Sequence, residues 1–398
     1  MPNSPKLLKY FPPMGVYETL FKFQDATGDY MGDEGTHPWA QGFPLTTQLP
    51  NGPELPSSVE FGYLDLKYPQ ATGNPELLEA IAKYYRHFYD ANITTDNVCV
   101  FAGGRPGIYA SVAFLPREYV VLIEETEYTP YYDLLELLDR NYTIVPSNQD
   151  NGFAPTPEDY RGASEGIEKP FYIKSNPCNP TGHVWHGDEL KSFINSVIEN
   201  DEAALIDEAY EFFNAHGAES ALKHIPDIDE TNIMVVGAAT KGLQVPGLRT
   251  GWVIAAKETI EIFRNFSSIG MGGVSRPSQI CVAKMLDIER VGQARNAVAR
   301  FYNEQRDWYR EHLSELGLKL FTGDGGFYHW AKLPDGLTAD KFNERLFEHK
   351  AAILPGHLCD MLRRGNGGPM GRFARFSFGP LKRNVRTDVI RIMGECLR

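Results

Sequence analysis

Between residues 75 and 236, short apolar runs alternate with stretches of helical periodicity, and this alternation limits the possible folds more than any other feature. A helix is expected to begin at Pro75, because proline suits a first helical turn and apolar residues follow at helical spacing. Strands that alternate with helices predict an α/β fold with a mostly parallel sheet covered by helices on both faces. Strands are expected at residues 98–101, 120–123, 171–173, 203–206 and 233–236, and helices at 106–114, 131–138 and 188–198.

The two ends of the chain follow other patterns. Residues 1–50 are rich in proline, glycine and acidic residues, with weak periodicity. A long amphipathic helix over 291–316 leads into a closing segment of mixed helix and strand character. We therefore expect a large domain over residues 51–290 and a smaller α/β domain built from 1–50 and 291–398.

Composition excludes several classes of protein. The chain has 398 residues, 42% of them apolar, which is enough for a substantial core. A net charge of −13 disfavours nucleic acid as a partner, and no apolar run reaches the length of about 18 residues that a membrane span requires. The first residues lack the pattern of a signal peptide, and five scattered cysteines fit reduced thiols. A cytoplasmic enzyme is the expectation.

Lys241 is the most informative single residue. It lies among small residues and is followed by a turn of the pattern Pro-Gly-x-Arg-x-Gly that contains Arg249. Burial and nearby cations can lower the pKa of a lysine until its amine is neutral, as the formation of a Schiff base requires. A structural ion pair is the alternative for a lone buried lysine.

Further candidate residues follow the predicted strands, where ligands bind to open parallel sheets. The segment Gly-Gly-Arg-Pro-Gly at 103–107 opens a helix and suits an anion, although such glycine pairs also form plain turns. Tyr128 can stack on a flat ring or simply pack. Asp207 can pair with a ring nitrogen or cap a helix. Asn179, in Asn-Pro-Cys-Asn-Pro-Thr-Gly, belongs to a pattern that seldom occurs as a mere turn.

Near the C-terminus, Arg375 stands in the segment Arg-Phe-Ala-Arg-Phe-Ser-Phe. The planar guanidinium group of an arginine can bind a carboxylate through two parallel hydrogen bonds. A surface charge on an edge strand is the alternative.

Together these segments resemble the fold-type I enzymes that depend on pyridoxal 5′-phosphate (PLP), and specifically the aspartate aminotransferase-like class I and II aminotransferases. The resemblance spans roughly residues 38 to 380. It implies a sheet of the seven-stranded type and a homodimer with two shared active sites. It also implies that Lys241 forms the Schiff base and moves protons, that Asp207 pairs with the pyridinium nitrogen, that Asn179 and Tyr210 bind the phenolate oxygen, and that Tyr128 stacks on the ring.

The same resemblance implies the remaining binding residues. The phosphate is expected to lie against Gly104, Arg105, Thr240 and Arg249, and the substrate carboxylate against Gly42, Asn179 and Arg375. Tyr68 matches the tyrosine that family members lend across the dimer to the phosphate of the neighbouring subunit.

The chain departs from the family pattern at the expected phosphate site. Ala238 stands where the family usually has a serine, and Arg105-Pro106 replaces the usual small or polar residues. We expect the guanidinium of Arg105 to compensate for the missing hydroxyl. Arg276 is also unusual, and either reaches the site of the neighbouring subunit or forms a surface salt bridge.

The expected reaction is transamination of an L-amino acid. Relatives with the same core residues act as lyases, cyclases, decarboxylases or oxidases, and these remain alternatives. A catalytically silent binding or regulatory protein is disfavoured, because Lys241 and Asp207 are both present.

Two other groups of residues allow weaker interpretations. His183 and His186, with two acidic residues after them, are not expected to hold a metal. The acidic residues of the segment 25–34 either attract a cationic substrate side chain or form a solvated loop, and the loop is favoured.

Overall fold

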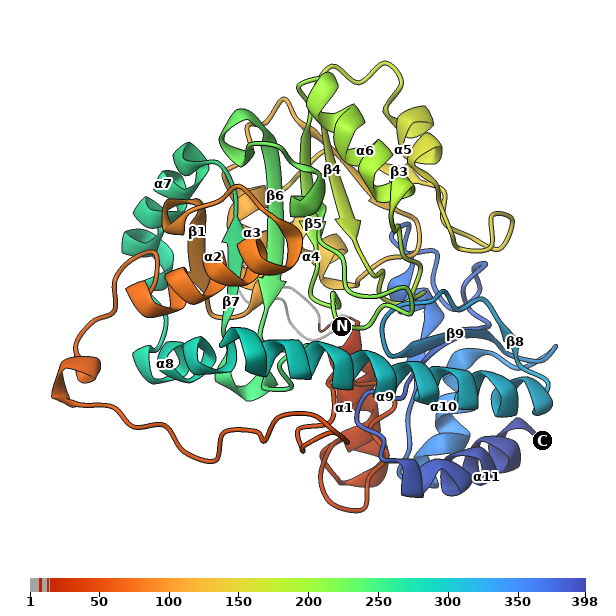
Figure 1. The fold of residues 1–398 in the computed structure, drawn as a ribbon. Helices are drawn as coiled ribbons and strands as arrows, with labels where there is room; N and C mark the ends of the chain where they lie inside the picture. Colours follow the sequence, from red (N-terminus) through yellow and green to blue (C-terminus); the bar gives the residue numbers. More distant parts are fainter. Residues whose placement is uncertain (1–6, 9–12, 14) are drawn as a thin grey trace.

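The computed structural model describes residues 7–8, 13 and 15–398, and its main feature is a seven-stranded sheet (Figure 1). The first six residues, on which the expectation of no signal peptide rests, lie outside the described residues. The strand order is β1-β7-β6-β5-β4-β2-β3, and all pairs are parallel except those that β7 makes with β1 and β6. The strands are β1 (Val98–Phe101), β2 (Val120–Glu124), β3 (Tyr142–Val145), β4 (Pro170–Ser175), β5 (Ala203–Asp207), β6 (Asn232–Ala238) and β7 (Gly251–Ile254). The expected mostly parallel sheet is confirmed.

Helices cover both faces of this sheet, which explains why its strands read as continuous apolar runs. Alternate strand residues belong to two separate clusters: Val100 and Ile206 pack on one face, and Phe101 and Leu205 on the other. The first face is covered by α2 (Pro75–Tyr89), α5 (Pro157–Ser164) and α6 (Asp188–Glu199), and the second by α3 (Gly104–Ala113), α4 (Pro130–Leu137) and α7 (Lys257–Phe266).

A second sheet of four antiparallel strands, in the order β10-β11-β9-β8, forms from the C-terminal part of the chain. Leu20 and Phe23 of the first helix pack against Trp330, Leu354 and Phe373 of this sheet, so both ends of the chain contribute to it. Its elements are α1 (Val16–Thr27), β8 (Lys319–Leu320), β9 (Tyr328–Lys332), α10 (Ala339–Phe347), β10 (Leu354–Pro355), β11 (Phe373–Ser377) and α11 (Arg386–Leu397). The division of the chain at residues 50 and 290 stays a prediction.

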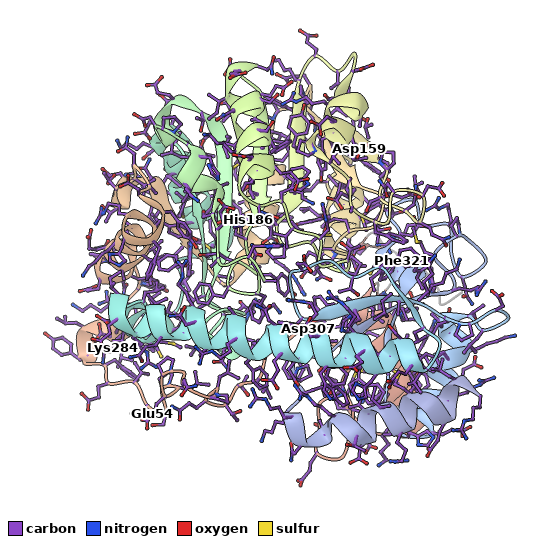
Figure 2. All side chains as sticks on the ribbon, turned by 45° about the vertical axis from the view of Figure 1, so that its right-hand side comes forward. Glu54, Asp159, His186, Lys284, Asp307 and Phe321 are labelled. Atoms are coloured by element: carbon purple, nitrogen blue, oxygen red, sulfur yellow. The ribbon has the colours of Figure 1, made fainter. Side chains whose placement is uncertain are left out.

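A long helix, α9 (Ile288–Glu315), follows α8 (Arg276–Met285) and runs past both sheets (Figure 1). Its buried residues, such as Val291, Val298 and Tyr302, recur at helical spacing. Charged side chains such as Lys284 on α8 and Asp307 on α9 stay exposed (Figure 2). No helix of the described part of the chain is long and apolar enough to cross a membrane.

The structure differs from the sequence expectations in several elements and boundaries. The sequence analysis did not predict α1, β3, α5, β7, α7 or α8. Strand β7 follows β6 without a crossover helix, because an antiparallel neighbour can be reached by a short connection. The helix expected from residue 106 begins at Gly104, after Gly103 with a φ of 99°. The helix expected from residue 291 begins at Ile288, because the side chain of Asp287 caps it by accepting a hydrogen bond from the Arg290 N–H.

Candidate active site

The predicted site residues converge on one cavity of about 520 Å³ at the carboxyl ends of the parallel strands. The structure brings together all of them except Tyr68, whose side chain is 92% exposed and lies outside the cavity. The predicted residues that line the cavity are Gly42, Gly104, Arg105, Tyr128, Asn179, Asp207, Tyr210, Thr240, Lys241, Arg249 and Arg375.

Lys241 follows β6, and its amine donates a hydrogen bond to the carbonyl oxygen of Gly42. The segment around Gly42 is tied to the lysine loop by Gln244, whose side-chain amide donates to the carbonyl oxygens of Leu45 at 2.6 Å and Thr47 at 3.0 Å. Desolvation, followed by the positive charges of the three cavity arginines, lowers the pKa of Lys241 to about 7, although Asp207 opposes the shift. The amine is therefore largely neutral at a slightly alkaline pH.

Asp207 is the last residue of β5 and is buried. Its Oδ2 accepts a hydrogen bond from the Tyr131 hydroxyl at 2.8 Å, and its Oδ1 accepts one from the Ala209 N–H at 3.0 Å. Burial raises the pKa of Asp207, and the bonds from Tyr131 and Ala209 oppose that shift. No helix begins directly after Asp207 in the described chain, so its bond to Ala209 is a local turn contact and the alternative of a helix cap does not apply.

Arg375 is buried on β11, which lies between β9 and β10 and is not an edge strand. Its Nη1 donates to Oδ1 of Asn179 at 2.8 Å, and its Nη2 donates to the Ala40 carbonyl oxygen at 2.6 Å. The guanidinium also lies 4.2 Å from the centre of the Tyr328 ring. Within the described chain its buried Nε has no hydrogen-bond partner. The alternative of a surface charge therefore does not apply.

The start of α3, Thr240 and Arg249 together place positive charge and hydrogen-bond donors in the cavity lining. Gly104 is the first residue of α3, and the N-cap residue Gly103 offers no side-chain bond to the free N–H groups. A Cβ at Gly103 would lie 2.3 Å from Nη2 of Arg249, so only glycine allows this guanidinium to approach. Arg105 donates from Nε to the Tyr128 hydroxyl at 2.5 Å. Together with Thr240, these groups suit an anion such as a phosphate.

Several residues that line or support the cavity were not predicted. Tyr328 hydrogen-bonds with Tyr210 through their hydroxyl groups. Tyr131 is the second residue of α4 and lies three residues after Tyr128, and this spacing was the available signal. Val16 and Tyr17 carried no signal, because only the fold brings the N-terminal helix to the cavity.

Other residues of the sequence analysis lie elsewhere. Arg276 pairs with Asp65 at 2.7 Å and does not line the cavity. Asp29 of the acidic segment pairs with Lys350 at 2.7 Å, while the other acidic residues of that segment are exposed. His186 lies 2.7 Å from Glu219.

Replacement of Gly42 by alanine is expected to disturb the cavity. A Cβ there would lie 2.2 Å from the Tyr328 hydroxyl oxygen, so the tyrosine must move. Crowding of this kind typically costs about 1–3 kcal/mol of unfolding free energy. Urea denaturation checks this value, with Gly162→Ala as the control, because nothing lies within 4 Å of a Cβ at that helical position. Equal stabilities of the Gly42 variant and the parent would contradict the expectation.

Comparison with known proteins identifies the family. Residues 55–380 match the family described as aminotransferase class I and II. An aspartate aminotransferase of Pyrococcus horikoshii is 28% identical over 333 residues, which is 82% of each chain. An aspartate/prephenate aminotransferase of Thermus thermophilus is 27% identical, over 73% of this chain and 75% of that one. A solved aspartate aminotransferase from Thermus thermophilus with maleate superposes with a TM-score of 0.79 at 21% identity, over 97% of each chain, and supports the fold. The chain therefore belongs to the class I and II aminotransferases, whose members use pyridoxal phosphate.

Proposed function

We propose that this chain transfers the amino group of an L-amino acid through PLP bound covalently to Lys241. The observation that carries the proposal is the position of the lysine amine. It lies in one cavity with the carboxylate of Asp207 and with two arginines, Arg249 and Arg375, that belong to different elements. The pKa of about 7 leaves the amine reactive near neutral pH.

The residues of the cavity fit PLP. The cavity volume of about 520 Å³ falls within the range of roughly 300–1,000 Å³ that is typical of small-molecule sites. The start of α3, Arg105, Thr240 and Arg249 would hold the phosphate, and the carboxylate of Asp207 would face the ring nitrogen. Arg375 keeps a buried Nε without a partner among the described residues, as expected of a side chain that receives a further anion.

When bound, PLP supplies an electron sink for the bond that breaks at the substrate Cα. The chain supplies binding and proton transfer around it. Arg375 would hold the substrate carboxylate by two parallel hydrogen bonds, which orients the Cα–H bond. The Lys241 amine, with its lowered pKa, would take and return the proton at the substrate Cα. Since Oδ1 of Asn179 accepts from Arg375, its Nδ2 is the group left to donate to the phenolate oxygen.

The proposed function is tested by adding single amino acids to the purified holoenzyme without any keto acid and recording its visible spectrum. Conversion to the pyridoxamine form, with one keto acid formed per site, supports transamination and identifies the donor. Release of ammonia or of a cyclised product, with PLP regenerated, would instead assign the chain to one of the alternative reactions. An unchanged spectrum with every amino acid would contradict both.

Replacement of Arg105 by alanine is expected to weaken the binding of PLP about tenfold or more, because one charge-assisted hydrogen bond contributes about 1.5–3 kcal/mol. The contact with Arg105 should matter because Ala238, which also lines the cavity, offers no hydroxyl to the phosphate. Equilibrium dialysis measures the dissociation constant, with Arg264→Ala on the exposed side of α7 as the control. Unchanged affinity would show that Arg105 does not replace the missing hydroxyl.

A homodimer is part of the proposal. Residues 61–68 expose a run of large apolar side chains, which suits a surface covered by a second copy. Tyr68, at the end of this run, would then reach the phosphate of the neighbouring subunit. Sedimentation of the holoenzyme tests the assembly, and weaker PLP binding by Tyr68→Phe tests the shared site. A cytoplasmic location is also proposed, supported by five cysteines that are all buried and free.

A further inference from the structure

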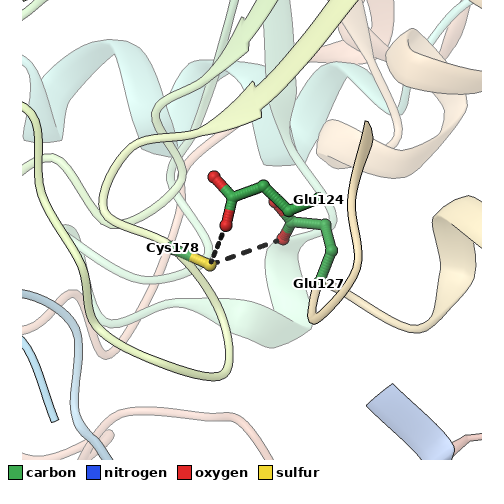
Figure 3. A group of neighbouring side chains, drawn as sticks. All are labelled: Glu124, Glu127 and Cys178. Atoms are coloured by element: carbon green, nitrogen blue, oxygen red, sulfur yellow. Dashed lines mark hydrogen bonds between the residues drawn. The ribbon is translucent and has the colours of Figure 1, made fainter. Parts of the chain in front are cut away.

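A cluster of buried ionisable side chains lies behind the cavity, where β2 and β4 end. Glu124, Glu127 and Cys178 form its centre, and the Cys178 sulfur lies 3.8 Å from an oxygen of each glutamate (Figure 3). Glu124 pairs with the buried ammonium of Lys174 and accepts a bond from the Tyr160 hydroxyl at 3.0 Å. Because the ammonium of Lys174 lies within the cluster, it balances the negative charge of Glu124, and no metal ion is needed for that purpose.

Glu127 has a different environment from Glu124. Its Oε1 accepts bonds from Oγ of Ser175 at 2.9 Å and from the Tyr128 N–H at 2.7 Å. Its Oε2 is buried and has no partner among the described residues. No ammonium or guanidinium group pairs directly with it in the described chain. Burial of a carboxylate without such a partner is costly, and burial of the neutral acid costs much less.

A chain of hydroxyl groups connects Glu127 to Asp207. Oγ of Ser175 lies 3.2 Å from the Tyr131 hydroxyl, which donates to Oδ2 of Asp207 at 2.8 Å. Ser175 has one hydroxyl proton. If Glu127 is ionised, Ser175 donates to it, and no proton lies between Ser175 and Tyr131. If Glu127 carries a proton, it can donate to Ser175, and every bond of the chain then points toward Asp207.

We propose that Glu127 is a positioning residue that acts as a protonated acid and, through Ser175 and Tyr131, directs hydrogen bonds onto the carboxylate of Asp207. This inference rests on the proposed function, in which Asp207 faces the ring nitrogen of PLP. A fully directed chain stabilises the negative charge of Asp207, and that charge keeps the ring nitrogen protonated. Glu127 also precedes Tyr128 directly, so the same side chain fixes the backbone of the ring-stacking residue.

The charged surroundings of Glu127 support the protonated form. Burial, and next the charge of Glu124 at the end of β2, raise the pKa of Glu127 to about 8, and Lys174 of β4 opposes this shift. The other titratable groups that face it are Cys178, Tyr131 on α4, Tyr160 on α5, and Cys359 of the 3-10 helix Gly356–Cys359 that follows β10. The acid is therefore protonated below about pH 8 and loses its proton above that pH. All hydrogen bonds from Glu127 through Ser175 and Tyr131 therefore point toward Asp207 only below about pH 8.

The test uses Glu127→Gln, because glutamine keeps the shape of the side chain and has no proton to lose, so its bond to Ser175 does not change with pH. In the apoprotein, infrared difference spectra between pH 6 and pH 9.5 should show a protonated carboxyl band that disappears near pH 8 and is absent from the variant. Glu208 and Glu211 are also buried carboxyls, and subtraction of the variant removes their bands. This readout needs neither PLP nor turnover, so it is independent of a failure of the proposed function.

The second readout is the dissociation constant of PLP as a function of pH. The affinity of the parent should fall about threefold above pH 8, because the ionised chain no longer supports Asp207. Glu127→Gln should show no such step, and Cys178→Ala, which alters the cluster but not the chain, should keep it. Ser175→Ala breaks the chain and should bind weakly at every pH. A parent without the infrared band, or a glutamine variant with the same pH step as the parent, would overturn the proposal.

Discussion

Lys241→Ala is expected to lower the rate of amino-group transfer by about 10²–10⁴-fold or more, the range that a positioned acid–base group contributes. The variant also loses the covalent attachment of PLP. No other lysine lines the cavity in the described part of the chain, so none can take over the position. The fold should persist, because the amine bonds to a single carbonyl oxygen, that of Gly42.

The measurement combines steady-state rates with reduction by borohydride and mass analysis of peptides. The parent should carry the reduced cofactor on the peptide that contains Lys241, and the variant should carry none. Lys257→Ala is the matched control, because that lysine is exposed, lies outside the cavity and pairs with Asp229 at 2.7 Å. A labelled peptide elsewhere in the variant, with activity retained, would refute the assignment of Lys241.

The sequence predicted those site residues that follow parallel strands or stand in specific local motifs. Asp207 is the last residue of β5 and Asn179 lies in the loop that follows β4, and strands that run in the same direction place their carboxyl ends at one edge. Lys241 and Arg249 were recognisable from the turn between them. In these cases the local sequence and the sheet topology together determine the position.

The residues that were missed are brought to the cavity by long-range packing. Val16 reaches it because α1 packs on a sheet formed more than 300 residues later, and apolar residues of this kind carry no chemical signal. Tyr328 lies in the closing segment of the chain, and its place in the cavity depends on the small size of Gly42. Glu127 carried no signal of its own, since nothing in a sequence shows toward which neighbours a glutamate points. Strand β7 was missed because it follows β6 without an intervening helix and so departs from the alternation of strands and helices on which the prediction rested.

Asp207→Asn is expected to lower kcat about 10²–10⁴-fold while the protein stays folded. Asparagine keeps the shape of the side chain and an oxygen that can accept from Tyr131 or Ala209, but it removes the charge. Loss of one partner of a buried ion pair typically costs about 3–5 kcal/mol, and each 1.4 kcal/mol changes a rate about tenfold. The effect should fall mainly on kcat, because the protonated ring nitrogen is needed most when charge moves into the ring. The binding of PLP should weaken less, since its phosphate contacts are separate.

Asp133→Asn distinguishes this specific effect from a general loss of negative charge in the cavity. Asp133 lines the same cavity, but its carboxylate pairs with Arg363 at 3.2 Å and belongs to α4. Its replacement should change kcat less than about tenfold, because a partly exposed ion pair contributes little free energy. Single-turnover rates for both variants, measured with the donor found in the spectral screen, decide the comparison. If the two variants lost equal activity, the net charge of the cavity would matter, and the position of Asp207 at the end of β5 would not.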